Sequence, residues 1–394
     1  MSTNEDRVEA LLAKGVTMAL PATVEIAPEV DLDRISGDGV VIHPGCRVRG
    51  ASTVLSAGVR IGREGPVTVE SCQLGPSVEL KGGYAAKSVF LASSSLGLGH
   101  HVREGSILEE EASGAHTVGL KQTILFPFVT LGSLINFCDA FMAGGTSRSD
   151  HSEVGSSYIH FNFTPTGDKT TPSRFGDVPR GVMLREHPIF LGGQGGTVGP
   201  VTVGYGSVVG AGSVLRRDID DEDTLRVVAA PGNLNRPFTP DTYARLYPLV
   251  ARNVSYLAHL DALEQWYRQA RRPFFAAQEL GEAVYEGALV ALAAARKERI
   301  TRLRKLARKL SVDNAAHEPM RTRVEELVAV FGPEVEALPP LPIAEHLEQA
   351  AGSVTYLEAV RGLDNEQAQA GTAWLQAVVD GRVAAAEGII PELA

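Results

Sequence analysis

Three short segments of the 394-residue sequence carry residue types that could do chemistry. The first is the pair His100 and His101, whose imidazoles could bind a metal ion. The pair is not part of a recognisable zinc-binding spacing of histidines, cysteines and carboxylates. We therefore favour an exposed turn at this position, and we expect no metal in the protein.

The second segment is the glycine-rich run Gly192-Gly193-Gln194-Gly195-Gly196. Its backbone N–H groups could surround a phosphate. A P-loop would continue into Lys-Ser or Lys-Thr at the start of a helix, and neither follows here. The run is therefore a flexible loop that could bind phosphate but is not a P-loop.

The third segment is a dense run of cations opposed only by Glu298. Leu303, Leu306 and Leu310 share one face of the expected helix, so the cations would cover its solvated face. The alternative is a surface that binds an anion or an acidic partner. The cations are Arg296, Lys297, Arg299, Arg302, Arg304, Lys305, Arg308 and Lys309.

The elements that would position these segments differ between the two halves of the chain. Of 41 glycines, 33 precede Leu234 and 8 follow it, while alanine, leucine, glutamate and arginine become frequent beyond Pro237. We expect an N-terminal helical segment at 1–23, a β-rich domain at 24–234 and an α-helical domain at 235–394.

The β-rich half repeats every six residues. The clearest case is Val203-Gly204-Tyr205-Gly206-Ser207-Val208, followed at once by Val209-Gly210-Ala211-Gly212-Ser213-Val214. Such hexapeptides predict a β-solenoid, specifically a left-handed parallel β-helix, because each short strand buries its aliphatic residue only by stacking on the next coil. A β-sandwich would instead alternate at period two. The repeats are interrupted between Lys81 and Arg185, where we expect loops and the binding face.

Beyond Pro240 the apolar residues recur at spacings of three and four. This pattern predicts a bundle or arm of four or more helices. The expected helices cover Tyr243 to Gln269, Leu280 to Leu310, Val324 to Phe331 and Val354 to Val379.

Charge and cysteine content limit the functional classes. The net charge of -10 disfavours a nucleic acid as partner. Cys46, Cys72 and Cys138 suggest neither a disulfide framework nor a zinc site. The N-terminus does not resemble a signal peptide, and no apolar stretch is long enough to span a membrane. We expect a cytoplasmic protein without a membrane partner.

The segment from Leu131 to Leu215 resembles a known family. It is similar to the acetyltransferase half of the bifunctional UDP-N-acetylglucosamine pyrophosphorylase/glucosamine-1-phosphate acetyltransferases, which are trimeric hexapeptide-repeat acyltransferases. The resemblance covers about 100 residues well and does not reach the helical C-terminus. The motifs that carry it are Gly119-Leu120-Lys121, Ile135-Asn136-Phe137, His160-Phe161-Asn162-Phe163, Gly167-Asp168-Lys169, Phe175-Gly176-Asp177, Ile189-Phe190-Leu191-Gly192-Gly193 and Gly199-Pro200-Val201.

The resemblance implies roles for individual residues. Lys121 and Lys169 would hold the phosphate of a sugar phosphate or UDP-sugar, which suits an ammonium on a long stem. Asn136 and Asn162 would join them in binding substrate, although an inward asparagine can simply bond the neighbouring backbone. The acyl carrier, acetyl-CoA or another acyl-CoA, would contact the positions of Phe163, Gly193 and Gly210.

The departures from the family pattern concern catalysis. Phe137 stands where the family has its general-base histidine, and a phenyl ring cannot accept a proton. His151 and His160 are the candidate replacement bases, and Asp139 and Glu153 are carboxylates in the same interrupted region. A lone histidine in such a segment is more often a loop or packing residue than a catalytic base.

Two functions remain open at this point. The first is a sugar-nucleotide or hexose-phosphate binding protein of the hexapeptide acyltransferase superfamily, which as an enzyme would be an acyl-CoA-dependent transferase with an altered base. The second is a non-catalytic binding or scaffold subunit whose helical C-terminus docks a protein partner. In either case the resemblance implies a homotrimer, with Lys121 or Lys169 near a subunit boundary.

Overall fold

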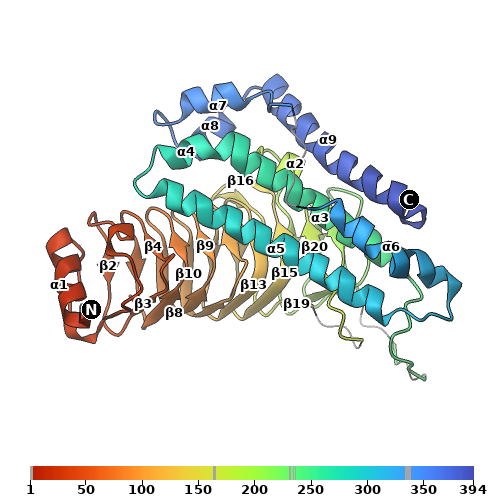
Figure 1. The fold of residues 1–394 in the computed structure, drawn as a ribbon, viewed down its shortest axis with the longest axis horizontal. Helices are drawn as coiled ribbons and strands as arrows, with labels where there is room; N and C mark the ends of the chain where they lie inside the picture. Colours follow the sequence, from red (N-terminus) through yellow and green to blue (C-terminus); the bar gives the residue numbers. More distant parts are fainter. Residues whose placement is uncertain (1–2, 163–165, 230–231, 234, 236, 333–338) are drawn as a thin grey trace.

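The structure is a computed structural model that describes residues 3–162, 166–229, 232–233, 235, 237–332 and 339–394. Its N-terminal half is a parallel β-solenoid of about 11 turns, and several helices form the C-terminal region (Figure 1). The predicted fold class, a hexapeptide-repeat solenoid followed by a helical region, is confirmed.

The strands of the solenoid are short, and most contain only two residues. Those of the first coils are β1 Glu25–Ile26, β2 Val41–Ile42, β3 Arg47–Arg49, β4 Val54–Leu55, β5 Arg60–Ile61, β6 Val67–Glu70, β7 Gln73–Leu74, β8 Glu79–Ala86, β9 Val89–Phe90, β10 Ser95–Val102, β11 Ile107–Leu108, β12 Ser113–Gly114, β13 Val118–Leu125, β14 Thr130–Leu131 and β15 Ile135–Met142. Those that follow are β16 Gly145–Ser147, β17 Asp150–His151, β18 Glu153–Val154, β19 Ile159–Phe161, β20 Ser173–Phe175, β21 Phe190–Leu191, β22 Gly196–Val198, β23 Thr202–Val203, β24 Val208–Val209, β25 Val214–Leu215 and β26 Leu225–Arg226.

The pairing register explains the six-residue period. In the regular coils a residue pairs with one about three hexapeptides away, as Ile107 does with Ile124 and Phe190 with Val208. Between β14 and β23 the coils contain inserted segments, so Glu153 pairs with Phe190. We call these the interrupted coils. The inserted segments include the antiparallel hairpin β16–β17 and the helix α2 Val178–Gly181.

Side chains alternate between the interior and the outer surface of the coils. Val102, Leu120, Phe137 and His160 are neighbours in register on β10, β13, β15 and β19, and all four are buried. The residues that precede them on these strands form the adjacent column, whose His101 and Ile159 are exposed. This alternation decides which predicted site residues can meet a ligand.

The helices pack along one side of the solenoid (Figure 1). They are α1 Asn4–Lys14 at the N-terminal end, and then α3 Leu246–Trp266, α4 Arg272–Ala276, α5 Gly281–Lys309, α6 Glu318–Ala329, α7 Ala344–Ala350, α8 Tyr356–Arg361 and α9 Asn365–Ile389. A π-helical turn, Tyr267–Arg271, joins α3 to α4. The single helix expected over Val354 to Val379 is wrong, because Thr355 and Asp364 each cap a separate helix.

Helix α5 runs lengthwise beside the coils (Figure 1). It contacts β7 and β9, and its Gly287 lies directly against the side chain of Gln73. A Cβ atom at Gly287 would come within 2.3 Å of Gln73 Oε1, so glycine permits this close approach. No helix within the described ranges is long and apolar enough to cross a lipid bilayer.

Buried ion pairs attach the helices to one another and to the coils. Arg299 of α5 lies 2.9 Å from Asp139 in β15, and Arg296 lies 2.9 Å from Asp261 in α3. Arg271 lies 3.0 Å from Glu109. The expectation that the basic run is a solvated face is therefore wrong for Arg296 and Arg299, which neutralise carboxylates inside the protein.

Candidate functional site

Lys121 and Asn136 lie on adjacent coils, on β13 and β15. The Lys121 ammonium is 2.8 Å from Glu104 Oε1 in the preceding coil. Asn136 is exposed, and its Oδ1 accepts a hydrogen bond of 3.2 Å from the thiol of Cys138. Because Cys138 pairs with Lys121 in register, the two predicted residues share one surface of the solenoid.

Asn162 and Lys169 lie beside Asp139. The Asn162 amide donates to Asp139 Oδ2 at 3.2 Å, while Arg299 donates to Asp139 Oδ1 at 2.9 Å and to the backbone carbonyl of Lys169 at 3.2 Å. Of the two predicted residues, only Asn162 contacts the carboxylate with its side chain, whereas Lys169 is linked to it through its backbone carbonyl and Arg299. Arg299 already occupies the other side of that carboxylate.

Phe137 and His160 lie in the interior of the solenoid. The Phe137 ring is fully buried against Tyr158, His160 and Phe175. His160 Nε2 is 2.7 Å from Ser173 Oγ, and burial lowers the pKa of the imidazole to about 3. Neither ring faces solvent, so neither side chain can reach a dissolved substrate in this arrangement.

The remaining predicted residues are dispersed. His151 is half-buried in the β16–β17 hairpin, where Nδ1 donates to the Arg148 carbonyl at 2.8 Å. Gly193 packs against the backbone of Ser156 in the neighbouring coil, and Gly210 donates its N–H to the Arg226 carbonyl. Phe163 lies outside the described residues.

The two histidines of the pair His100 and His101 lie in different surroundings. His100 is buried, donates from Nδ1 to the Gly97 carbonyl at 3.0 Å, and has its pKa lowered to about 4 by burial. The expected exposed turn is wrong, because both histidines lie in strand β10; His101 is exposed, and its ring is tilted by 37° against that of Tyr84. Over the described part of the chain, no three histidine, cysteine or carboxylate side chains are grouped as metal ligands.

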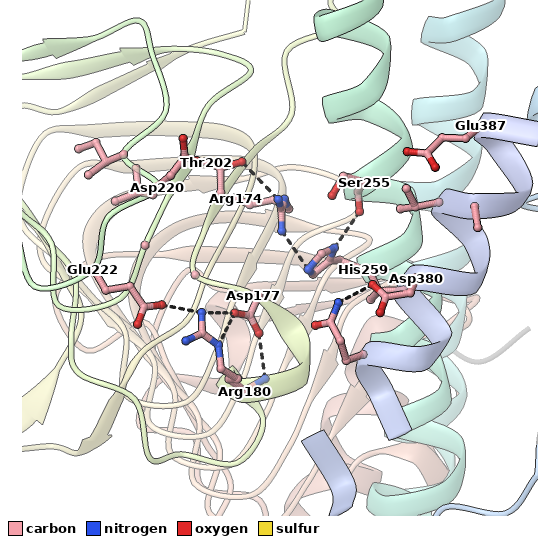
Figure 2. A pocket seen from close by; sticks show the side chains of 18 residues that line it. Arg174, Asp177, Arg180, Thr202, Asp220, Glu222, Ser255, His259, Asp380 and Glu387 are labelled. Atoms are coloured by element: carbon pink, nitrogen blue, oxygen red, sulfur yellow. Dashed lines mark hydrogen bonds and ion pairs between the residues drawn. The ribbon is translucent and has the colours of Figure 1, made fainter. Parts of the chain in front are cut away.

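A polar cavity of about 540 Å³ lies between the end of the interrupted coils and the C-terminal helices (Figure 2). Its solenoid wall comes from β20, β23 and the loop after β25, and its helical wall comes from α3 and α9. The polar and charged residues around it are Arg174, Asp177, Arg180, Thr202, Asp220, Glu222, Ser255, His259, Gln376, Asp380 and Glu387.

Arg174 is the unusual residue of this cavity. Its Nη1 donates to His259 Nε2 at 2.9 Å, and its Nη2 donates to Thr202 Oγ1 at 3.3 Å (Figure 2). Among the described residues, no carboxylate oxygen lies within ion-pair distance of this guanidinium. Burial lowers the pKa of Arg174 and outweighs the opposing effect of nearby aspartates, of which Asp177 contributes most, but a guanidinium keeps its charge in proteins. The cavity is therefore lined by a half-buried cation that has no carboxylate in direct contact with it.

His259 is held as a neutral acceptor. Its Nδ1 donates to the Ser255 carbonyl at 2.8 Å, which leaves Nε2 to accept from Arg174. Burial, and then the charge of Arg174, lower the pKa of His259 well below its usual value. The imidazole thus fixes the direction of the guanidinium without neutralising it.

Carboxylates surround the rest of the cavity. Arg180 lies 2.7 Å from both Asp177 and Glu222, so those charges are paired. Asp380 Oδ1 accepts only from the amide of Gln376 among the described residues, and Glu387 lies on the same wall (Figure 2). The cavity thus joins a cationic inner end to an acidic rim on α9.

Sequence reasoning missed this cavity because its walls are far apart in the chain. Arg174 and His259 are separated by 85 positions, and no local period connects them. One signal was present: Arg174 directly precedes Phe175-Gly176-Asp177, one of the motifs of the family resemblance. An arginine in an interrupted coil beside such a motif is a candidate ligand residue.

Comparison with known proteins agrees with the resemblance. The chain is 28% identical over 217 residues to the bifunctional protein GlmU of Thermotoga sp. (strain RQ2), covering 54% of this chain and 42% of the relative. It is 29% identical over 229 residues to GlmU of Nitratidesulfovibrio vulgaris, covering 56% and 44%. No family model matches the chain.

These matches and the solenoid together support a hexapeptide-repeat, GlmU-like domain in the N-terminal half. The chain spans less than half the length of the curated relatives it matches. The match covers 54% of this chain, and the remainder lies outside it.

Proposed function

We propose that this protein binds a phosphorylated sugar, and that an amino-sugar phosphate or its nucleotide sugar occupies the cavity of Figure 2. Arg174 carries the proposal. It is a half-buried guanidinium at a cavity of about 540 Å³, and although Asp177, Asp218 and Asp220 lie near enough to act on its charge, no described carboxylate is in direct contact with it. A phosphate would accept its unused N–H donors in the bidentate geometry that arginine favours.

The acidic rim makes an amino sugar the best fit. A purely anionic ligand would meet repulsion from Asp380 and Glu387. A ligand with a phosphate at one end and an ammonium at the other would pair both ends. The similarity to proteins named GlmU supports a sugar-phosphate ligand independently of the cavity.

Acyl transfer is the finer part of the proposal. Acetyl-CoA would be the acyl donor, and His151 and His160 were the bases suggested by sequence. We expect slow transfer or none, because His160 is enclosed and a missing general base costs about 100- to 10,000-fold in rate. Release of free CoA thiol from acetyl-CoA and glucosamine 1-phosphate, with the His151→Ala and His160→Ala variants alongside, measures this directly.

The binding site is tested by calorimetry with glucosamine 1-phosphate, glucose 1-phosphate and UDP-N-acetylglucosamine. Arg174→Gln should weaken binding about 10- to 100-fold, since a charge-assisted hydrogen bond contributes about 1.5–3 kcal/mol. Lys121→Ala and Lys169→Ala test the alternative site that the family resemblance implies, and they should leave the affinity unchanged if the ligand lies in the cavity. If the lysine variants lose affinity and Arg174→Gln does not, the ligand lies along the solenoid surface, and the cavity assignment is wrong.

A non-catalytic scaffold is the second candidate, and one observation favours it. Helix α5 places Arg299 against Asp139, so a helix of the chain itself covers that side of the interrupted coils. A non-catalytic binding or scaffold subunit would release no CoA thiol, whether or not it binds a sugar. A protein partner at the helical region would then be its ligand.

The homotrimer remains part of the proposal. Phe190, Val208 and Leu225 are neighbours in register on β21, β24 and β26, and all three are exposed. Such an apolar column on the solenoid flank suits contact with another copy. Light scattering at micromolar concentration should give three times the monomer mass, and a monomer would contradict the trimer.

A further inference from the structure

A second cavity, of about 520 Å³, lies between one edge of the solenoid and the helices α4 and α8. The solenoid side is a column of coil corners that includes Ser93 and Glu110. The helical side includes Phe274 in the middle of α4 and Tyr356 at the start of α8. It shares no lining residue with the cavity of Arg174.

Negative charge exceeds positive charge beside this cavity. Glu109 and Glu110 both pair with Arg271, and the three side chains are 1%, 11% and 1% exposed. The hydroxyl of Tyr267 donates to Glu109 at 2.6 Å but brings no charge. Two buried carboxylates thus share one guanidinium. Consistent with this excess, burial and the neighbouring Glu110 outweigh Arg271 and raise the pKa of Glu109 to about 7.

Glu110 is the member of this group that lines the cavity. One of its oxygens contacts Arg271, whereas Oε2 is buried and has no hydrogen-bond partner among the described residues. The residue as a whole is 9% exposed. An unpaired carboxylate oxygen in such a place costs free energy unless a donor reaches it through the cavity.

Aromatic rings form the opposite wall. Phe274 and Tyr356 meet edge to face, with ring centroids 5.6 Å apart. Tyr356 Oη accepts a 2.8 Å hydrogen bond from Trp266, which fixes the ring, and the Arg271 guanidinium already lies 4.0 Å from the Tyr356 centroid. Aromatic rings beside a carboxylate are the combination that binds organic cations.

We propose that this cavity binds a small organic cation, a primary or quaternary amine, between the free oxygen of Glu110 and the rings of Phe274 and Tyr356. The ammonium would supply the positive charge that Arg271 alone does not. The proposal does not depend on the sugar-phosphate site, because the two cavities are separate.

The test is calorimetric titration of the full chain with tetramethylammonium chloride and with butylammonium chloride, using sodium chloride for ionic strength. We expect saturable binding of one or both amines and none of sodium. Glu110→Gln keeps the shape of the side chain, and Arg271 still pairs with Glu109, so this variant should fold. Its affinity for the amines should be at least about tenfold lower than that of the parent. Glu348→Gln, an exposed glutamate of α7, is the matched control and should bind as the parent does.

A second variant tests the proposal in case Glu110→Gln does not fold. Phe274→Leu keeps the charges and removes one ring, and it should weaken tetramethylammonium more than butylammonium. Absence of saturable binding to the unaltered protein would overturn the proposal, as would equal affinity in Glu110→Gln. If the parent binds no amine and Glu110→Gln is more stable than the parent, the proposal is wrong. A proton, and not an amine, then neutralises the excess negative charge of Glu109 and Glu110.

Discussion

Arg299 in helix α5 donates a 2.9 Å hydrogen bond to Asp139 in the solenoid, across 160 positions of the sequence. Both side chains are almost inaccessible, at 2% and 6% exposure. Asn162 donates to the other oxygen of the same carboxylate, so Asp139 is bound from the coil and from the helix. The pair joins the helical region to the interrupted coils.

Arg299→Met should destabilise the protein by about 3–5 kcal/mol, because it leaves Asp139 buried without its cation. The double variant Arg299→Met, Asp139→Asn should recover much of that loss, since no charge is left unpaired. Urea unfolding of the single and double variants measures both values. A single variant as stable as the parent would show that the pair adds nothing to the native state.

Phe137→His should not create acetyltransferase activity. The ring at this position lies inside the solenoid against Tyr158 and Phe175, so an imidazole placed there could not meet a substrate. The variant should instead lose about 1–3 kcal/mol of stability, the usual penalty for a buried polar group without a partner. CoA thiol release and urea unfolding check the two expectations, and a gain of turnover would refute the first.

Stability should fall as the pH falls from about 6.5, because His160 and His100 are buried. Burial lowers the pKa of His160 to about 3 and that of His100 to about 4, whereas in the unfolded chain both would protonate near pH 6.5. The unfolded state therefore binds more protons below pH 6.5. Each histidine should then cost up to about 1.4 kcal/mol per pH unit, until its folded pKa is reached.

The pH effect is measured by urea unfolding at pH 7, 6 and 5. His160→Gln should be less stable than the parent at pH 7, yet its stability should fall less steeply with acid. His116→Gln, which removes an exposed imidazole, is the control and should keep the parent's slope. Equal slopes in all three proteins would show that His160 protonates normally in the folded state.

The native cysteines should resist alkylation. Cys46, Cys72 and Cys138 are buried, and burial raises the pKa of Cys72 to about 12 and that of Cys138 to about 11. The reactive thiolate is therefore scarce at pH 8. Mass spectrometry after iodoacetamide should find no labelled cysteine in native protein and three in urea. Rapid labelling of Cys138 in native protein would contradict its burial.

The solenoid was predictable because its signal is local and repeated. Val203, Val209 and Leu215 recur at six-residue intervals in sequence and lie on successive short strands in the structure. The longer strand β15 was harder, since it departs from the hexapeptide pattern. Ile135 and Phe137 alternate there with exposed Asn136, and this period of two is the sequence feature that indicates an inward Phe137.

The cavities were not predictable, because each is formed by segments that only tertiary packing brings together. Arg174 meets His259, and Glu110 meets Arg271, across 85 and 161 positions. Periodicity predicted that the basic run would be helical, but not that Arg296 and Arg299 would point toward acidic partners. Which face of a helix is buried depends on what packs against it. Because the cations of this run lie on several faces of the helix, their positions in the sequence do not show which of them are buried.

Helix α5 contacts the solenoid at two places, Gly287 against Gln73 and Arg299 against Asp139. The distance between these contacts along the helix must therefore match the distance between them along the solenoid. From Gly287 to Arg299, α5 advances twelve residues, or about 18 Å. From Gln73 to the coil of Asp139, the solenoid advances four strand spacings, or about 19 Å. Adding or deleting one coil there would shift these contacts by about 4.8 Å, close to one helical turn. Homologues with a different number of coils in this stretch should therefore carry a compensating insertion or deletion of three or four residues in α5.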